Sequence, residues 1–322
     1  MDRHRNLALS MTSLSTSHTR NNFGYAKAIL FGEHSVVYGY KAVVCSLGKG
    51  ASAEVKRERP PKGAARYSFR GIDTDFLVQE NDHSSIAVAY AALFSLLNVA
   101  PLSLDINLDI PTGAGLGSSA AIGVASARAI VGHEEINEDL IAPAVAAFEK
   151  VFHSNPSGVD QAAATHRGLF SYDKKEGLER IDNCELHLVI AKVSERAPTH
   201  EIVEAFAAHK EKDPDLFRRV LEEMGEIAVQ GIAAIKTGND VEIGHLMLEN
   251  QRLLKCMEMS SDALDFTCKL AMEKGALGAK LTGAGRGGCM IALVEKNNID
   301  VEKALKSQGY WTKRTLISAV QE

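Results

Sequence analysis

Residues 102–131 constrain the fold of this chain more than any other segment. From 102 to 110, apolar residues alternate with polar ones, which is the pattern of a half-buried strand. A loop with three glycines follows at 113–119, and an alanine-rich stretch at 120–131 then predicts a tightly packed helix. A strand, a glycine loop and a helix in this order are typical of an anion site in a chain that mixes α and β structure.

The glycine loop has the chemistry of a phosphate site. Gly113, Gly115 and Gly117 allow positive φ angles and a close approach of the backbone to a ligand, and the first free N–H groups of the following helix point toward an anion. The spacing fits neither the dinucleotide fingerprint nor the P-loop, because lysine is absent and Ser118 and Ser119 stand at the helix start. A serine hydroxyl at this place can bind Mg²⁺. The alternative is a tight turn whose small residues serve packing alone.

The remaining pattern predicts a mixed α+β chain. We expect strands at 26–31, 186–193, 279–281, 289–294 and 311–317, a hairpin at 168–181, and helices at 86–98, 137–153, 159–165, 199–209, 216–236, 241–257 and 261–274. The length of 322 residues predicts two domains, placed at 23–184 and 185–322. Residues 1–22 are rich in Ser, Thr and Arg, and we interpret them as a disordered leader or an artefact of the assigned start site, although their composition also loosely resembles a transit peptide.

Charge and cysteine content exclude several classes of protein. The net charge of −5 argues against a dedicated nucleic-acid binder, so any phosphate site has to be built locally. Five cysteines without a C-x-x-C pair argue against a disulfide framework and a zinc site, and favour a reducing, cytoplasmic location. The longest apolar run, 86–100, is shorter than the roughly 20 residues that span a membrane. We therefore expect neither nucleic acid nor a membrane as a partner.

Three segments resemble the signature motifs of the galactokinase, homoserine kinase, mevalonate kinase and phosphomevalonate kinase superfamily. They read KAILFGEHSVVYG at 27–39, PTGAGLGSSA at 111–120 and KLTGAGRGGC at 280–289. A fourth segment, EKVFHSNPSGVD at 149–160, is most similar to the mevalonate kinases within this superfamily. The resemblance covers most of the chain. It implies two α+β domains with the active site in the cleft between them.

The resemblance also implies an activity. The γ-phosphoryl group of ATP, bound with Mg²⁺, is expected to pass to the 5-hydroxyl of (R)-mevalonate in isoprenoid biosynthesis. The resemblance is also compatible with a homodimer. One alternative is another kinase of the superfamily that acts on phosphomevalonate or a sugar. A second is a ligand-sensing relative without turnover, which is expected to lack one of Lys27, Glu149 and Asp160. All three are present.

The resemblance assigns roles to these three residues, and each role has an alternative. Asp160 is the expected proton acceptor, although after the Pro-Ser-Gly turn it also suits a helix N-cap. Lys27 is expected to supply positive charge at the transferred group, or is simply a basic residue at a strand edge. Glu149 and Ser119 are the expected Mg²⁺ ligands, whereas a glutamate near a helix end is otherwise a solvated surface group.

Substrate and nucleotide contacts follow from the same resemblance. Glu33 and His34 are expected to face the substrate, although His34 alone is an ordinary loop histidine. Thr199 is expected near the acceptor or as the N-cap of the next helix. The expected ATP-binding residues are Gly113, Ala114, Gly115, Leu116, Gly117, Ser118, Ser119, Gly283, Ala284 and Gly285.

Arg286 departs from the family pattern, which has glycine at this place in the second glycine loop. A left-handed backbone there costs a non-glycine residue about 1–2 kcal/mol. Two interpretations remain: an exposed position that tolerates any side chain, or a cation added beside the triphosphate.

Overall fold

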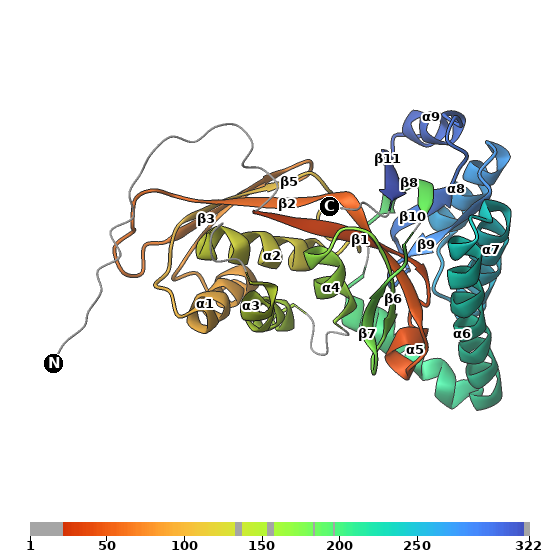
Figure 1. Ribbon diagram of the computed structural model, residues 1–322, viewed down its shortest axis with the longest axis horizontal. Helices are drawn as coiled ribbons and strands as arrows, with labels where there is room; N and C mark the ends of the chain where they lie inside the picture. The colour runs from red at the N-terminus through yellow and green to blue at the C-terminus, as the bar shows by residue number, and fades with distance from the viewer. Residues whose placement is uncertain (1–21, 133–136, 153–157, 183, 196, 319–322) are drawn as a thin grey trace.

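The computed structural model describes residues 22–132, 137–152, 158–182, 184–195 and 197–318. Within these residues the chain forms two sheets, each with its own group of helices (Figure 1). The predicted leader lies outside the described residues except for Asn22. No helix in the described ranges has the length and apolarity needed to cross a membrane.

The first sheet has seven strands in the order β4-β3-β5-β2-β6-β7, with β1 paired to β2. Only β3 and β5 run parallel; the other pairs are antiparallel. The strands are β1 (Phe23–Phe31), β2 (Ala42–Val55), β3 (Arg66–Gly71), β4 (Asp75–Gln79), β5 (Leu104–Leu108), β6 (Leu169–Asp173) and β7 (Gly177–Arg180). A 3₁₀ turn, η1 (Ser35–Tyr38), lies between β1 and β2.

Helices α1 (Ser85–Leu97), α2 (Ser118–Val131) and α3 (Glu138–Lys150) lie together on one face of the long strands (Figure 1). Small residues allow α2 to sit close to the sheet, and all residues from 120 to 128 are buried. Asn137 caps the N-terminus of α3, because its side chain accepts a hydrogen bond from the Asp139 N–H at 3.0 Å. The short helix α4 (Val159–Thr165) packs against β1 and α2.

The second sheet has four antiparallel strands in the order β11-β8-β10-β9. Its strands are β8 (Glu185–Ser194), β9 (Gly278–Thr282), β10 (Gly288–Leu293) and β11 (Trp311–Ser318), and its helices are α5 (Thr199–Lys212), α6 (Pro214–Lys236), α7 (Asp240–Cys256), α8 (Asp262–Glu273) and α9 (Asp300–Ser307). The two longest helices, α6 and α7, lie side by side at the outer edge (Figure 1).

Strand β1 joins the two halves of the molecule. Its side chains Ala26, Leu30 and Phe31 belong to the same buried cluster as β8, β10, α6 and α7. The Lys27 N–H donates to the carbonyl of Leu116 in the first glycine loop at 2.9 Å. The Ile29 N–H donates to Thr282 Oγ1, at the start of the second glycine loop, at 2.8 Å. One strand therefore holds both glycine loops in place.

Candidate active site

The first glycine loop connects β5 to α2 and is fixed from below by its apolar residues. Gly113, Gly115 and Gly117 have φ angles of 64°, 82° and 72°, as the sequence predicts for this loop. Ala114 and Leu116 between them are each 1% exposed and pack into the core. Gly117 is the N-cap of α2 and supplies no side-chain hydrogen bond to the helix start. The first N–H groups of α2 are thus available to an anion.

Lys27 and Asp160 form an ion pair beside this loop. Lys27 Nζ lies 3.0 Å from Asp160 Oδ1, and the side chains are 6% and 30% exposed. The pairing of β1 with β2 is irregular between Tyr25 and Lys27, and such a bulge re-aims the next side chain. Asp160 is in the first turn of α4, whose N-cap is Gly158, so the capping alternative for Asp160 does not hold.

Glu149 and Ser119 lie next to this pair. The Ser119 hydroxyl donates to Glu149 Oε1 at 3.4 Å. Glu149 is 1% exposed, so it is not the solvated surface group of the alternative interpretation. Burial, and to a lesser extent the charge of Asp160, raise the pKa of Glu149 to about 8, against the opposing effects of Lys27 and the Ser119 hydroxyl. With this pKa the Glu149 carboxyl is largely protonated near neutral pH, and a cation bound beside it would favour the ionised form.

This donor set fits magnesium. Mg²⁺ is usually held by one or two carboxylates together with substrate phosphates and water. Ser119 and Glu149 offer a hydroxyl and a carboxylate at the start of α2, where phosphate is also favoured. Among the residues that the structure describes, no group of three or more His, Cys, Asp and Glu side chains forms a closed metal site. The ion would therefore depend on a bound nucleotide for further ligands.

The second glycine loop, residues 283–288, is tied to His34. His34 Nε2 lies 2.8 Å from the carbonyl oxygen of Ala284, which only accepts, so Nε2 carries the proton and donates. The ring stacks on Phe206 of α5 at a centroid distance of 4.3 Å. Burial lowers the pKa of His34 to about 4; the bond to Ala284 opposes this effect and the charge of Arg286 adds to it.

Glu33 is buried and does not face solvent. It is 1% exposed, and its carboxylate forms an ion pair with the fully buried Lys280 of β9. Its second oxygen accepts a hydrogen bond from Asn250 Nδ2 of α7 at 3.1 Å. Both oxygens are thus engaged by protein groups, which favours a structural role over the substrate contact that the sequence predicts. Thr199 is the half-buried first residue of α5, whose N-cap is Pro198.

Arg286 has the left-handed backbone that makes glycine favourable in this loop, with φ at 52°. Its N–H donates to the Met259 carbonyl at 2.7 Å, and Nε donates to the Glu258 carbonyl at 3.1 Å. Glu258 itself has a φ of 58°. The guanidinium is therefore held by the turn between α7 and α8.

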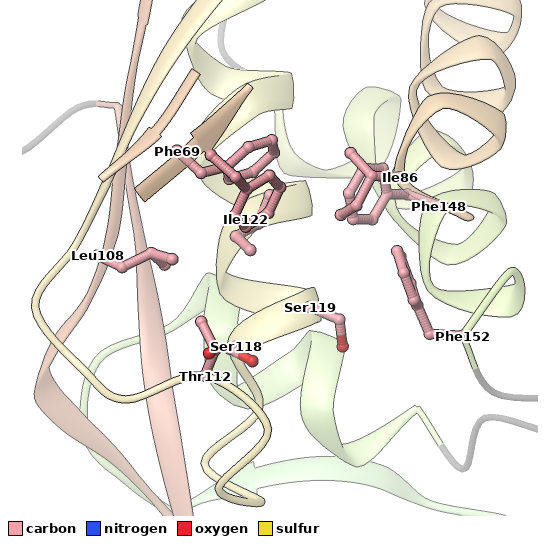
Figure 2. A pocket seen from close by; sticks show the side chains of 10 residues that line it. Phe69, Ile86, Leu108, Thr112, Ser118, Ser119, Ile122, Phe148 and Phe152 are labelled. Carbon is pink, nitrogen blue, oxygen red and sulfur yellow. The ribbon is translucent and has the colours of Figure 1, made fainter. Parts of the chain in front are cut away.

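A cavity of about 200 Å³ adjoins the start of α2 (Figure 2). Its apolar lining comes from Phe69, Phe76, Ile86, Leu108, Ile122, Phe148 and Phe152, and its polar lining from Thr112, Ser118 and Ser119. Figure 2 shows Thr112 and Ser118 close together at one end and Ser119 apart from them, with the apolar side chains around the rest. Phe69 and Phe76 were not predicted from the sequence, because β3 and β4 were not predicted as strands. The alternation of Tyr67 and Phe69 with polar residues was the available signal.

Comparison with known proteins agrees with the geometry. The model of the GHMP kinases N terminal domain matches residues 84–168, and the model described as GHMP kinases C terminal matches residues 232–310. A mevalonate kinase of Thermococcus sibiricus is 31% identical over 308 residues, which cover 88% of this chain and 92% of that protein. The mevalonate kinase of Pyrococcus furiosus is 32% identical, with the same coverage of both chains.

Solved structures confirm the fold class. The crystal structure of L. major mevalonate kinase in complex with R-mevalonate has a TM-score of 0.84 and 26% identity, and the match covers 94% of this chain and 96% of that one. A galactokinase of Lactococcus lactis, at 18% identity and a TM-score of 0.68, shares the fold. The chain has the two-domain α+β fold of these kinases. With both family models and full-length relatives matched, this chain belongs to the GHMP kinase family.

Proposed function

We propose that this chain is a mevalonate kinase, which transfers the γ-phosphoryl group of ATP to the 5-hydroxyl of (R)-mevalonate. The observation that carries the proposal is the Lys27–Asp160 pair, 3.0 Å apart, beside the glycine loop that leads into α2. The relatives named above are mevalonate kinases, and one structural neighbour holds R-mevalonate. The proposal includes a cytoplasmic location, which a sequence with five cysteines and no C-x-x-C pair favours.

Asp160 acts as the proton acceptor in this proposal. Its carboxylate is partly exposed, whereas Lys27 is buried behind it. As the 5-hydroxyl oxygen bonds to the γ-phosphorus, its proton passes to Asp160, the bond from phosphorus to the bridging oxygen breaks, and ADP leaves. The Lys27 ammonium offsets negative charge on the transferred group. Most of the rate enhancement then comes from positioning and electrostatics.

The nucleotide lies along the first glycine loop. The free N–H groups at the start of α2 hold the phosphates, and the apolar cavity beside them has space and lining suited to the base. Ser119 and Glu149 would hold magnesium, which offsets phosphate charge when bound. Residues 283–285 are the proposed nucleotide contacts from the second half of the chain. We propose that the two domains divide near Cys184, since β8, the first strand of the second sheet, begins at Glu185.

On the acceptor side, His34 and Thr199 are the proposed contacts. The neutral His34 ring is fixed by Ala284 and Phe206, so its orientation is set before substrate arrives. Glu33 supports this turn from beneath through Lys280 and does not itself contact substrate in the proposal.

The test is ADP release by the purified full chain with mevalonate, 5-phosphomevalonate and galactose measured side by side. We expect turnover with mevalonate alone. Preference for either other acceptor would move the chain to another activity of the superfamily. If the protein bound ATP and mevalonate but released no ADP, it would be a ligand-binding relative and the proposal would be wrong.

A further inference from the structure

An ion pair connects the two sheets beside the first glycine loop. Asp73 lies in the turn between β3 and β4 of the first sheet, and Lys192 lies on β8 of the second. Lys192 Nζ is 3.1 Å from Asp73 Oδ2. The Lys192 side chain is 17% exposed and the Asp73 side chain is 31% exposed, so both are largely shielded from solvent. An ion pair in this setting is held more firmly than one at the open surface.

The other oxygen of Asp73 holds the start of the glycine loop. Asp73 Oδ1 accepts hydrogen bonds from the Thr112 N–H at 3.1 Å and from Thr112 Oγ1 at 3.3 Å. Thr74 Oγ1 donates to the same oxygen at 3.2 Å. Thr112 directly precedes Gly113 and also lines the cavity beside α2 (Figure 2). Any shift of Asp73 is therefore transmitted to the loop.

Lys192 is fixed at the other glycine loop. It pairs on β8 with Cys289 of β10, the residue that follows the loop 283–288. Its ammonium also lies 2.8 Å from Oε1 of the exposed Glu195. Burial alone would lower the pKa of Lys192, but the hydrogen bonds to Glu195 and Asp73 outweigh it and raise the pKa. For Asp73, burial is likewise outweighed, chiefly by the Thr112 N–H and Lys192, and the pKa is lowered. Both groups stay charged near neutral pH.

We propose that the Asp73–Lys192 pair is a positioning device that sets the distance between the two glycine loops and so determines the affinity for the ATP triphosphate. The inference rests on the proposed function in one respect: the ligand between the loops is a nucleotide. Lys192 acts through Asp73 and Thr112, and its ammonium is not itself a phosphate ligand. A lysine that binds phosphate directly is the competing role.

The variants D73N, K192M, K192R and D73N/K192M separate these roles. Asn at 73 keeps an oxygen for the Thr112 N–H and removes only the charge that faces Lys192. We expect D73N and K192M each to weaken ATP binding about tenfold, which corresponds to about 1.4 kcal/mol. The double variant should lose no more than either single one, since both remove the same interaction. K192R should stay within about threefold of wild type.

The measurements are the ATP dissociation constant by calorimetry and, with mevalonate, KM for ATP and kcat. We expect KM for ATP to rise while kcat changes little, which a general loss of stability would not produce. K306M, which breaks the 2.7 Å ion pair with Glu302 on α9, is the matched control and should leave ATP binding unchanged.

Three results would overturn the inference: wild-type affinity in D73N and K192M, additive losses in the double variant, or a loss confined to K192M, which would make Lys192 a direct phosphate ligand. Failure of the proposed function can be told apart from failure of this inference. If the protein binds ATP but does not phosphorylate mevalonate, calorimetry still measures how the Asp73–Lys192 pair affects ATP affinity. A wild-type chain that does not bind ATP would overturn both.

Discussion

Lys27 Nζ lies 3.0 Å from Asp160 Oδ1, with the lysine almost fully buried and the aspartate nearly a third exposed. The ammonium therefore stands behind the carboxylate, and the carboxylate is the more accessible member of the pair. Lys27 follows an irregularity in the pairing of β1 with β2, and Asp160 lies in the first turn of α4, so the two side chains come together from different elements.

Asp160→Asn should abolish most turnover and leave nucleotide binding intact. The amide is close in shape but cannot accept the hydroxyl proton, and loss of a general base costs about 10²–10⁴-fold in rate. ATP affinity should stay within about threefold of wild type, because Asp160 is not among the groups proposed to hold phosphate. Single-turnover ADP release and calorimetry check the two parts. Near-normal turnover would remove Asp160 from the proton-accepting role.

Gly117→Ala should damage activity more than stability. A Cβ at this position would lie 3.0 Å from Lys27 Cγ, and its backbone φ of 72° strains any side chain by about 1–2 kcal/mol. We expect the added Cβ to displace Lys27, and kcat to fall more than about tenfold as a result. Gly238→Ala is the matched control: its φ is 66°, but a Cβ there meets nothing within 4 Å. Both variants should lose similar unfolding free energy, and equal kcat values in the two would contradict the prediction.

Much of the fold was accessible from the sequence because it depends on local patterns. The helix 159–165 and the strand that begins near 186 were predicted within a residue or so of their observed bounds. The hairpin of β3 and β4 was missed, since charged residues interrupt its short strands and only Tyr67, Phe69 and Val78 are well buried.

The site was predicted where a motif carries its chemistry and missed where partners are distant in sequence. Lys27, Ser119, Glu149 and Asp160 were named in advance and lie together in the structure. The partner of Glu33 was not predicted. Lys280 lies in a strand whose other residues are small or apolar, and nothing near it in the sequence indicates that it pairs with Glu33. Roles assigned by resemblance stay predictions until the variants are measured.

Lys280→Met should destabilise the fold strongly. Burial lowers the pKa of Lys280 against the attraction of Glu33, and its removal leaves the Glu33 carboxylate buried without a counter-charge. Loss of one member of a buried pair costs about 3–5 kcal/mol. The double variant E33Q/K280M should recover much of this loss, since no unpaired charge then remains. Denaturant unfolding measures the difference, with K306M as the exposed control; equal losses in K280M and K306M would contradict a buried pair.

His34 should make stability depend on pH between about 6.5 and 4. Burial lowers its pKa from 6.5 in the unfolded chain to about 4 in the folded one, so the unfolded state binds the extra proton first as pH falls. Its contribution is complete above 6.5 and is lost toward pH 4, by about 1.4 kcal/mol per pH unit. His34→Gln should flatten the wild-type slope of unfolding free energy against pH in that window. Parallel curves for the two proteins would count against a neutral, buried His34.

Arg286→Gly should leave ATP binding within about threefold of wild type, because the guanidinium is held by the Glu258 carbonyl at 3.1 Å and serves the turn, not the triphosphate. Glycine removes the strain of a φ of 52° but also removes this hydrogen bond, so stability should change little. Arg286→Ala separates the two effects. It loses the same bond but keeps the strain, and should unfold about 1–2 kcal/mol more easily than Arg286→Gly. If ATP binding fell more than about tenfold in both variants and was retained in Arg286→Lys, positive charge would be what matters, and Arg286 would act as a cation beside the phosphates.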